Sequence, residues 1–148
     1  MIDGSESLGS LEQANSMLSE TKKILVVEDN PAFSSIVQFH LERVGYEVIV
    51  AFDGREARQR IRHSSDLFDL VITDQQMPHV SGEQLVRHLQ QDTKYSRIPI
   101  IMLTAKALEL DVTRLRDEFN IAAVIAKPFS PTDLVGTVEA CLGMQVSP

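Results

Sequence analysis

The feature that most constrains the fold is a fivefold alternation between short apolar runs and segments with helical periodicity. The first run, Ile24–Val27, is continuous and apolar, which is typical of a strand buried on both faces. In the segment after it, Val37 and Leu41 recur at helical spacing. Strict alternation of strand and helix predicts an α/β fold, a parallel sheet with helices on both faces. We expect right-handed crossovers between its strands.

The sequence also sets the bounds of the expected elements. The expected strands are Ile24–Val27, Glu47–Ala51, Leu70–Ile72, Ile98–Leu103 and Ala122–Ala126. The expected helices run from Pro31 to Gly45, Gly54 to Ser64, Ser81 to Asp92, Leu108 to Phe119 and Pro131 to Leu142. One domain is therefore expected over residues 22–142. It follows an N-terminal extension (residues 1–21, flexible or a short helix) and precedes a C-terminal tail (143–148).

Charge and composition exclude several classes of function. The net charge is −7, whereas a protein that binds nucleic acid directly needs a basic face. We interpret the arginines of the second helix as a solvated face: Arg55, Arg58, Arg60 and Arg62. A single cysteine, Cys141, excludes an internal disulfide. No signal peptide and no membrane-spanning stretch is evident, so we expect a cytoplasmic protein with no membrane partner.

Polar residues follow the strands at the point where each strand ends. Glu28 and Asp29 follow the first strand, and Asp74 follows the third. Thr104 follows the fourth strand, and Lys127 follows the fifth. Because ligands bind at the carboxyl edge of open α/β sheets, we expect these side chains to meet there. Three close carboxylates raise one another's pKa, and a divalent cation relieves that repulsion. Oxygen ligands without Cys or His favour Mg²⁺ over zinc.

Each group has a chemical use at such a site. A carboxylate such as Asp74 beside Mg²⁺ can attack phosphorus and form an acyl phosphate. Lys127 supplies a compact positive charge for the phosphoryl oxygens, and the Thr104 hydroxyl can donate a hydrogen bond to one of them. Taken singly, each residue has an ordinary structural explanation, such as a surface lysine or a strand-end threonine. Their coincidence at consistent strand ends favours the functional interpretation.

Four segments, in this order, resemble the receiver domains of two-component response regulators. The segments are Ile24–Asn30, Asp74–Pro78 with Gly82, Leu103–Ala105, and Lys127–Phe129. The resemblance covers about residues 22–142 and implies a flavodoxin/CheY-like sheet with strand order 2-1-3-4-5. It implies a phosphorelay signalling domain that catalyses only its own phosphorylation and dephosphorylation, and not an enzyme with external substrates.

The resemblance assigns a role to each matched residue. Asp74 is the implied phosphoacceptor, Thr104 the switch hydroxyl and Lys127 the catalytic lysine. The implied ligands of Mg²⁺ (or Mn²⁺) are Glu28, Asp29, Asp74 and the backbone carbonyl of Gln76. The implied loop-shaping residues are Met77, Pro78, Gly82 and Pro128, with a cis bond before Pro128.

One departure from the family pattern concerns the switch, and two further positions concern hydrolysis of the phosphate. Val124 stands three positions before Lys127, where the family often has an aromatic switch residue. The resemblance therefore does not assign a path from Asp74 to the output surface. Gln76 and Lys106 stand where the family admits water to the phosphate. We expect their long side chains to slow hydrolysis.

The resemblance also implies partners. A histidine kinase or phosphotransfer protein would donate the phosphoryl group, and a downstream protein would bind the face of the fourth helix, fifth strand and last helix. A homodimer through this face is also allowed.

Two alternative functions stay open. A degenerate receiver would act as a phosphorylation-independent interaction scaffold, which Val124 slightly favours. A Mg²⁺-dependent phosphohydrolase usually has Asp-x-Asp after the first strand, where this chain has Glu28-Asp29-Asn30.

Overall fold

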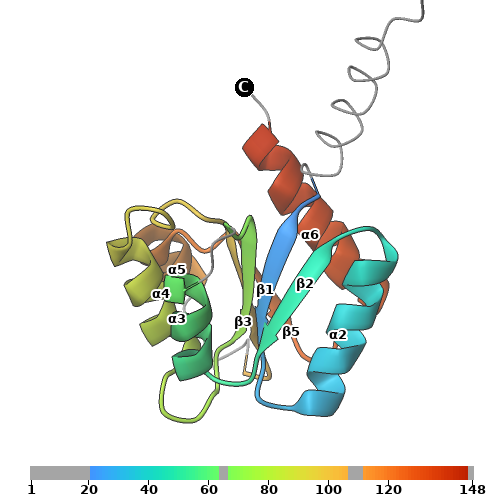
Figure 1. Ribbon diagram of the computed structural model, residues 1–148, viewed down its shortest axis with the longest axis horizontal. Helices are drawn as coiled ribbons and strands as arrows, with labels where there is room; N and C mark the ends of the chain where they lie inside the picture. Colours follow the sequence, from blue (N-terminus) through green and yellow to red (C-terminus); the bar gives the residue numbers. More distant parts are fainter. Residues whose placement is uncertain (1–20, 64–66, 107–111, 147–148) are drawn as a thin grey trace, which may run out of the picture.

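A computed structural model describes residues 21–63, 67–106 and 112–146. Five parallel strands form one sheet in the order β2-β1-β3-β4-β5 (Figure 1), which confirms the expected fold. The strands are β1 (Lys23–Val27), β2 (Glu47–Ala51), β3 (Leu70–Asp74), β4 (Ile100–Thr104) and β5 (Ala123–Ala126). The helices are α2 (Pro31–Arg43), α3 (Gly54–His63), α4 (Gly82–Gln91), α5 (Val112–Phe119) and α6 (Pro131–Val146).

Some bounds differ from the expected ones. Strand β4 begins at Ile100 and not at Ile98, because Pro99 has no N–H for a strand ladder. Helix α6 continues to Val146, so residues 143–146, which we expected in the tail, are helical. Gly143 has no left-handed backbone conformation that would end the helix there. The expected N-terminal extension up to residue 20, and the expected helical positions Ser64 and Leu108, lie outside the described residues.

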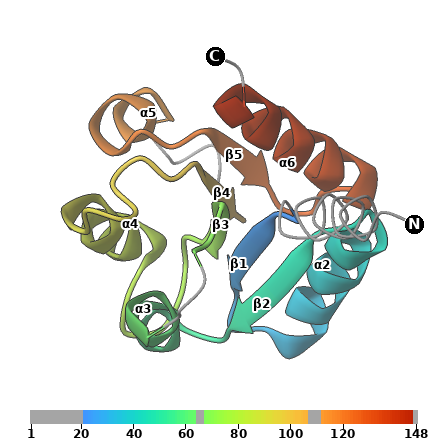
Figure 2. The same ribbon diagram turned by 45° about the horizontal axis from the view of Figure 1, so that its top comes forward.

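The sheet separates two layers of helices. Helices α3, α4 and α5 cover one face, and α2 and α6 cover the other (Figure 2). Neighbouring side chains of β1 alternate between the layers: Leu25 and Val27 pack with the first, Ile24 and Val26 with the second. Both layers bury apolar side chains against β1 and β3, so these strands form a fixed base for the groups at their carboxyl ends.

Within the described residues, no helix combines the length and apolarity needed to cross a membrane.

Helix α2 begins directly after the acidic pair that follows β1. The Asn30 side chain accepts a hydrogen bond from the Phe33 N–H at 3.1 Å, and Pro31 occupies the first turn. Asn30 therefore caps the helix. Because the connection is this short, Glu28 and Asp29 are held at the carboxyl edge of the sheet.

Candidate functional site

The carboxyl edge of the sheet gathers the polar residues expected from the sequence. The parallel register pairs Val27 with Thr73, Asp74 with Leu103, and Thr104 with Ala126, so four strands end at the same level. The side chains that follow these ends point into one region. The structure therefore brings together residues that are far apart in the sequence.

Lys127 bridges two of the carboxylates. Its ammonium donates to Glu28 Oε2 at 3.0 Å and to Asp74 Oδ2 at 3.2 Å. Burial acts to lower the pKa of Lys127, but the hydrogen bond to Glu28 and the negative charge of Asp74 outweigh it, so the pKa is raised. The lysine is thus fixed in its charged form beside Asp74.

The three acids form a cluster of oxygen ligands. One carboxylate oxygen from each of Glu28, Asp29 and Asp74 lies within 4.8 Å of the others. Burial raises the pKa of Glu28, and the nearby charge of Asp74 raises it further, although contact with Lys127 acts in the opposite direction. Glu28 and Asp74 are buried, whereas Asp29 is exposed. The cluster therefore has one side open to water.

One oxygen of Asp74 is left without a partner. Oδ1 is buried, and no hydrogen-bond donor among the described residues reaches it. A buried acceptor without a donor is costly, so this oxygen favours a ligand that offers a positive charge or an electrophilic centre. Together with the all-oxygen donor set, this makes the cluster suitable for Mg²⁺.

The hydroxyl of Thr104 is engaged by the loop that follows β3. The Gln76 amide nitrogen donates to Thr104 Oγ1 at 3.1 Å, and the amide oxygen lies 3.3 Å from the same hydroxyl. The Lys106 N–H also donates to this hydroxyl, at 2.9 Å. Thr104 thus lies at the site but is bound to Gln76 and Lys106. The proposed role of the Gln76 backbone carbonyl as a metal ligand stays a prediction.

The loop between β3 and α4 depends on a glycine. A Cβ on Gly82 would lie 2.7 Å from the Asp74 carbonyl oxygen and 2.8 Å from Gln75 Oε1. Only glycine therefore allows α4 to begin this close to the end of β3. In the same loop, Met77 is partly buried against the core, and Pro78 accepts a hydrogen bond from the Val80 N–H at 2.7 Å.

The remaining positions named from the sequence lie on or after β5. The Lys127–Pro128 peptide bond is cis, as the resemblance implies. Val124 is partly buried and packs against the cluster between the sheet and α3, α4 and α5. An aliphatic side chain therefore occupies the place of the aromatic switch residue.

Sequence reasoning missed the part that Phe33 plays at this site. Its ring lies 4.5 Å from the Lys127 ammonium and contacts Phe129 edge to face at 5.4 Å. The sequence pattern assigned Phe33 no role at the site. A usable signal was its position in the first turn after the acidic pair, which brings it to the carboxyl edge of the sheet.

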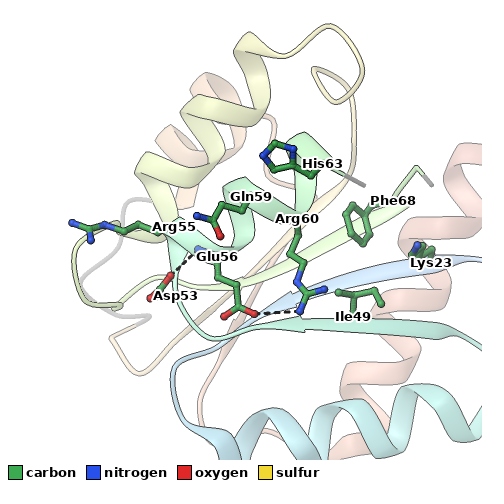
Figure 3. A pocket seen from close by; sticks show the side chains of 9 residues that line it. All are labelled: Lys23, Ile49, Asp53, Arg55, Glu56, Gln59, Arg60, His63 and Phe68. Atoms are coloured by element: carbon green, nitrogen blue, oxygen red, sulfur yellow. Dashed lines mark hydrogen bonds and ion pairs between the residues drawn. The ribbon is translucent and has the colours of Figure 1, made fainter. Parts of the chain in front are cut away.

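A prominent hollow on the described surface lies away from this site. A pocket of about 740 Å³ lies between α3 and β2, and Figure 3 shows it lined by Lys23, Arg60, Phe68 and neighbouring residues. None of the clustered acids lines it. The candidate site is therefore identified by its charged groups and not by the size of a cavity.

Comparisons with known proteins agree with this geometry. The family model of the response regulator receiver domain matches residues 24–139. The chain is 41% identical over 121 residues to the phosphate regulon transcriptional regulatory protein PhoB of Rhizobium meliloti, covering 81% of the chain and 52% of PhoB. It is 34% identical over 123 residues to the polar-differentiation response regulator DivK of Brucella ovis, covering 83% of the chain and 98% of DivK. In three relatives the chain spans only 8% to 52% of the relative's length.

A solved structure adds a metal to the comparison. The receiver domain of a sensor histidine kinase from Pseudomonas aeruginosa, with a magnesium ion coordinated in its active site cleft, superposes with a TM-score of 0.74. The identity is 28%, and the match covers 83% of this chain and 98% of that one. The similarity thus extends over nearly all of that receiver domain.

Proposed function

Because the chain belongs to the response regulator receiver domain family, we propose that it accepts a phosphoryl group on Asp74 and changes its partner binding as a result. Receiver domains are signalling domains of two-component systems and not classical enzymes. The observation that carries the proposal is the Asp74 carboxylate, which is buried, has one oxygen on Lys127 and has the other without a donor in the described structure.

The geometry supports a simple transfer. Asp74 Oδ1 would attack phosphorus, and the bond from phosphorus to the nitrogen of a donor phosphohistidine would break. The histidine nitrogen takes the bonding pair. The Lys127 ammonium would break its hydrogen bond to Glu28 and contact a new phosphoryl oxygen instead. The Thr104 hydroxyl would donate to another such oxygen after release from Gln76. No external substrate is turned over.

The same cluster would hold the metal. We propose that Glu28, Asp29, Asp74 and the backbone carbonyl of Gln76 bind Mg²⁺ or Mn²⁺, which supplies positive charge for the phosphoryl oxygens. The magnesium ion in the active site cleft of the Pseudomonas aeruginosa receiver domain supports this assignment. So does the lack of a donor to Asp74 Oδ1 among the described residues.

The proposed output follows from Thr104. Movement of its hydroxyl toward the phosphate would pull the loop after β4 and change the face formed by α5, β5 and α6. A downstream protein would bind that face, with a homodimer as the alternative. The donor would be a histidine kinase or phosphotransfer protein. A cytoplasmic location stays a prediction.

Mass spectrometry of the intact protein tests the proposal. After incubation with acetyl phosphate and Mg²⁺, we expect a gain of one phosphoryl group that Asp74→Asn abolishes. Asp117→Asn, which removes an exposed acid on α5, is the matched control and should label normally. No mass gain under conditions that label a known receiver domain would favour the scaffold, and turnover of external phosphate esters would favour the phosphohydrolase.

A further inference from the structure

A second charged surface lies between α3 and α4, which pack side by side on one face of the sheet (Figure 2). Two adjoining hollows, of about 360 and 100 Å³, share Arg58 and His88 in their linings and together form one groove. We call it the α3–α4 groove. Its charged and titratable lining residues are Arg58, Arg62, His79, Arg87, His88 and Asp92.

The groove is positive although the chain has a net charge of −7. Asp92 is the only carboxylate among its lining residues, all of which lie in the described part of the chain, and Asp92 Oδ1 accepts the Lys94 N–H at 2.8 Å. Partial burial lowers the pKa of His88, and the charges of Arg58 and Arg62 lower it further. The groove thus repels a further positive charge.

The acids of the two helices point away from the groove. Glu56 of α3 pairs with Arg60 on the side facing β2, where Figure 3 shows the two side chains joined. Glu83 of α4 pairs with Arg114 of α5 at 2.7 Å. Across the residues that the structure describes, no carboxylate lies within ion-pair distance of Arg58 or Arg62. The arginines that we interpreted as one solvated face therefore divide between two sides of α3.

We propose that the α3–α4 groove binds an acidic segment of a partner protein. Charge complementarity supports such an occupant, because exposed arginines attract carboxylates and the Gln84 and Gln91 amides can bind a peptide backbone. Nucleic acid is disfavoured, since no Phe, Tyr or Trp lines the groove for base stacking. The groove also continues over two hollows, which suits an extended segment better than one small anion.

This surface is separate from the acidic cluster but adjoins its loop. His79 and Val80 line the groove and belong to the connection between β3 and α4. Val80 also packs tightly against the start of α3, because a Cβ on Gly54 would lie 2.5 Å from Val80 Cβ. A bound segment would therefore contact the loop that follows Asp74.

Fluorescence anisotropy with a labelled oligoglutamate peptide, at low salt and with the full chain, tests the proposal. We expect the double change Arg58→Gln/Arg62→Gln to weaken binding about fivefold to tenfold, because it removes two positive charges from the groove, one half-buried and one exposed. Arg58→Lys/Arg62→Lys keeps the charge and should retain binding. The matched control, Arg55→Gln/Arg60→Gln, removes the same charge from the side of α3 that faces the other pocket, and should weaken binding less than about twofold.

Three results would overturn the proposal. Equal weakening by both double glutamine variants would show that only net charge matters. Tighter binding of single-stranded oligothymidylate, abolished by the groove variant, would indicate a nucleic-acid surface. Complete displacement of the peptide by inorganic phosphate at equal charge concentration would indicate a site for a single anion. Circular dichroism of each variant establishes that the fold is retained.

Discussion

At the scale of single residues, the Gln76 amide occupies the Thr104 hydroxyl that we propose as the switch group. We expect Gln76→Ala to speed labelling by acetyl phosphate about twofold to tenfold, because one neutral hydrogen bond no longer competes with the phosphoryl group. Time-resolved intact mass measures the rate. Gln59→Ala, on the exposed surface of α3, should leave it unchanged. An unaltered rate in Gln76→Ala would mean that this contact does not restrain Thr104.

Lys127 is the residue whose substitution should change the free energy of unfolding by an amount that depends on Mg²⁺. Lys127→Met leaves the buried Glu28 and Asp74 carboxylates without their shared cation. We expect the free energy of unfolding to fall by about 2 kcal/mol in EDTA, below the full cost of breaking a buried pair because Lys127 is partly exposed. Saturating Mg²⁺ should restore part of the loss. Urea unfolding measures both values, with Lys106→Met on the same edge as control. An equal loss with and without Mg²⁺ would contradict the explanation.

At the scale of elements, alanine substitutions at two glycines should change the free energy of unfolding in opposite directions. Gly82→Ala would place a Cβ 2.7 Å from the Asp74 carbonyl oxygen and should lower the free energy of unfolding by about 1–3 kcal/mol. A Cβ added at Gly136, within α6, would meet no atom within 4 Å beyond the helix's own backbone, so Gly136→Ala should raise the free energy of unfolding by about 0.5–1 kcal/mol. Urea unfolding compares the two. A neutral Gly82→Ala would show that the β3–α4 loop can move away from Asp74.

The elements also show how far sequence reasoning reaches. Periodicity and strand-end spacing predicted the layers and the gathering of Glu28, Asp74 and Lys127, because these depend on local pattern and on parallel pairing. The contact between Gln76 and Thr104 joins loops 28 residues apart, and no local pattern encodes such a side-chain pair. The division of the α3 arginines depends on which neighbour packs beside each side of the helix, and therefore on tertiary structure.

At the scale of the whole molecule, the acidic cluster should couple metal binding to stability. Mg²⁺ that binds only the folded state stabilises it by about 1.4 kcal/mol at a tenfold excess over its dissociation constant. The melting temperature should therefore rise by several degrees. Asp74→Asn removes one of the three clustered carboxylates and should reduce that rise, whereas Asp117→Asn should not. Calorimetry with and without EDTA gives both values. A rise of equal size in Asp74→Asn would place the bound ion outside the cluster.

Cys141 can report whether that stabilisation is global. It is the only cysteine and is buried in the layer of α2 and α6, where burial raises its thiol pKa. If the thiol reacts only after the whole domain opens, the same excess of Mg²⁺ should slow its alkylation about tenfold. If α6 opens by itself, Mg²⁺ should have no effect on the alkylation rate, because the acids lie at the carboxyl ends of β1 and β3 and not on α6. Glu28→Gln/Asp29→Asn, which weakens the metal site, should remove the dependence. Mg²⁺-independent labelling of the unaltered chain, together with a raised melting temperature, would show that α6 opens separately from the sheet.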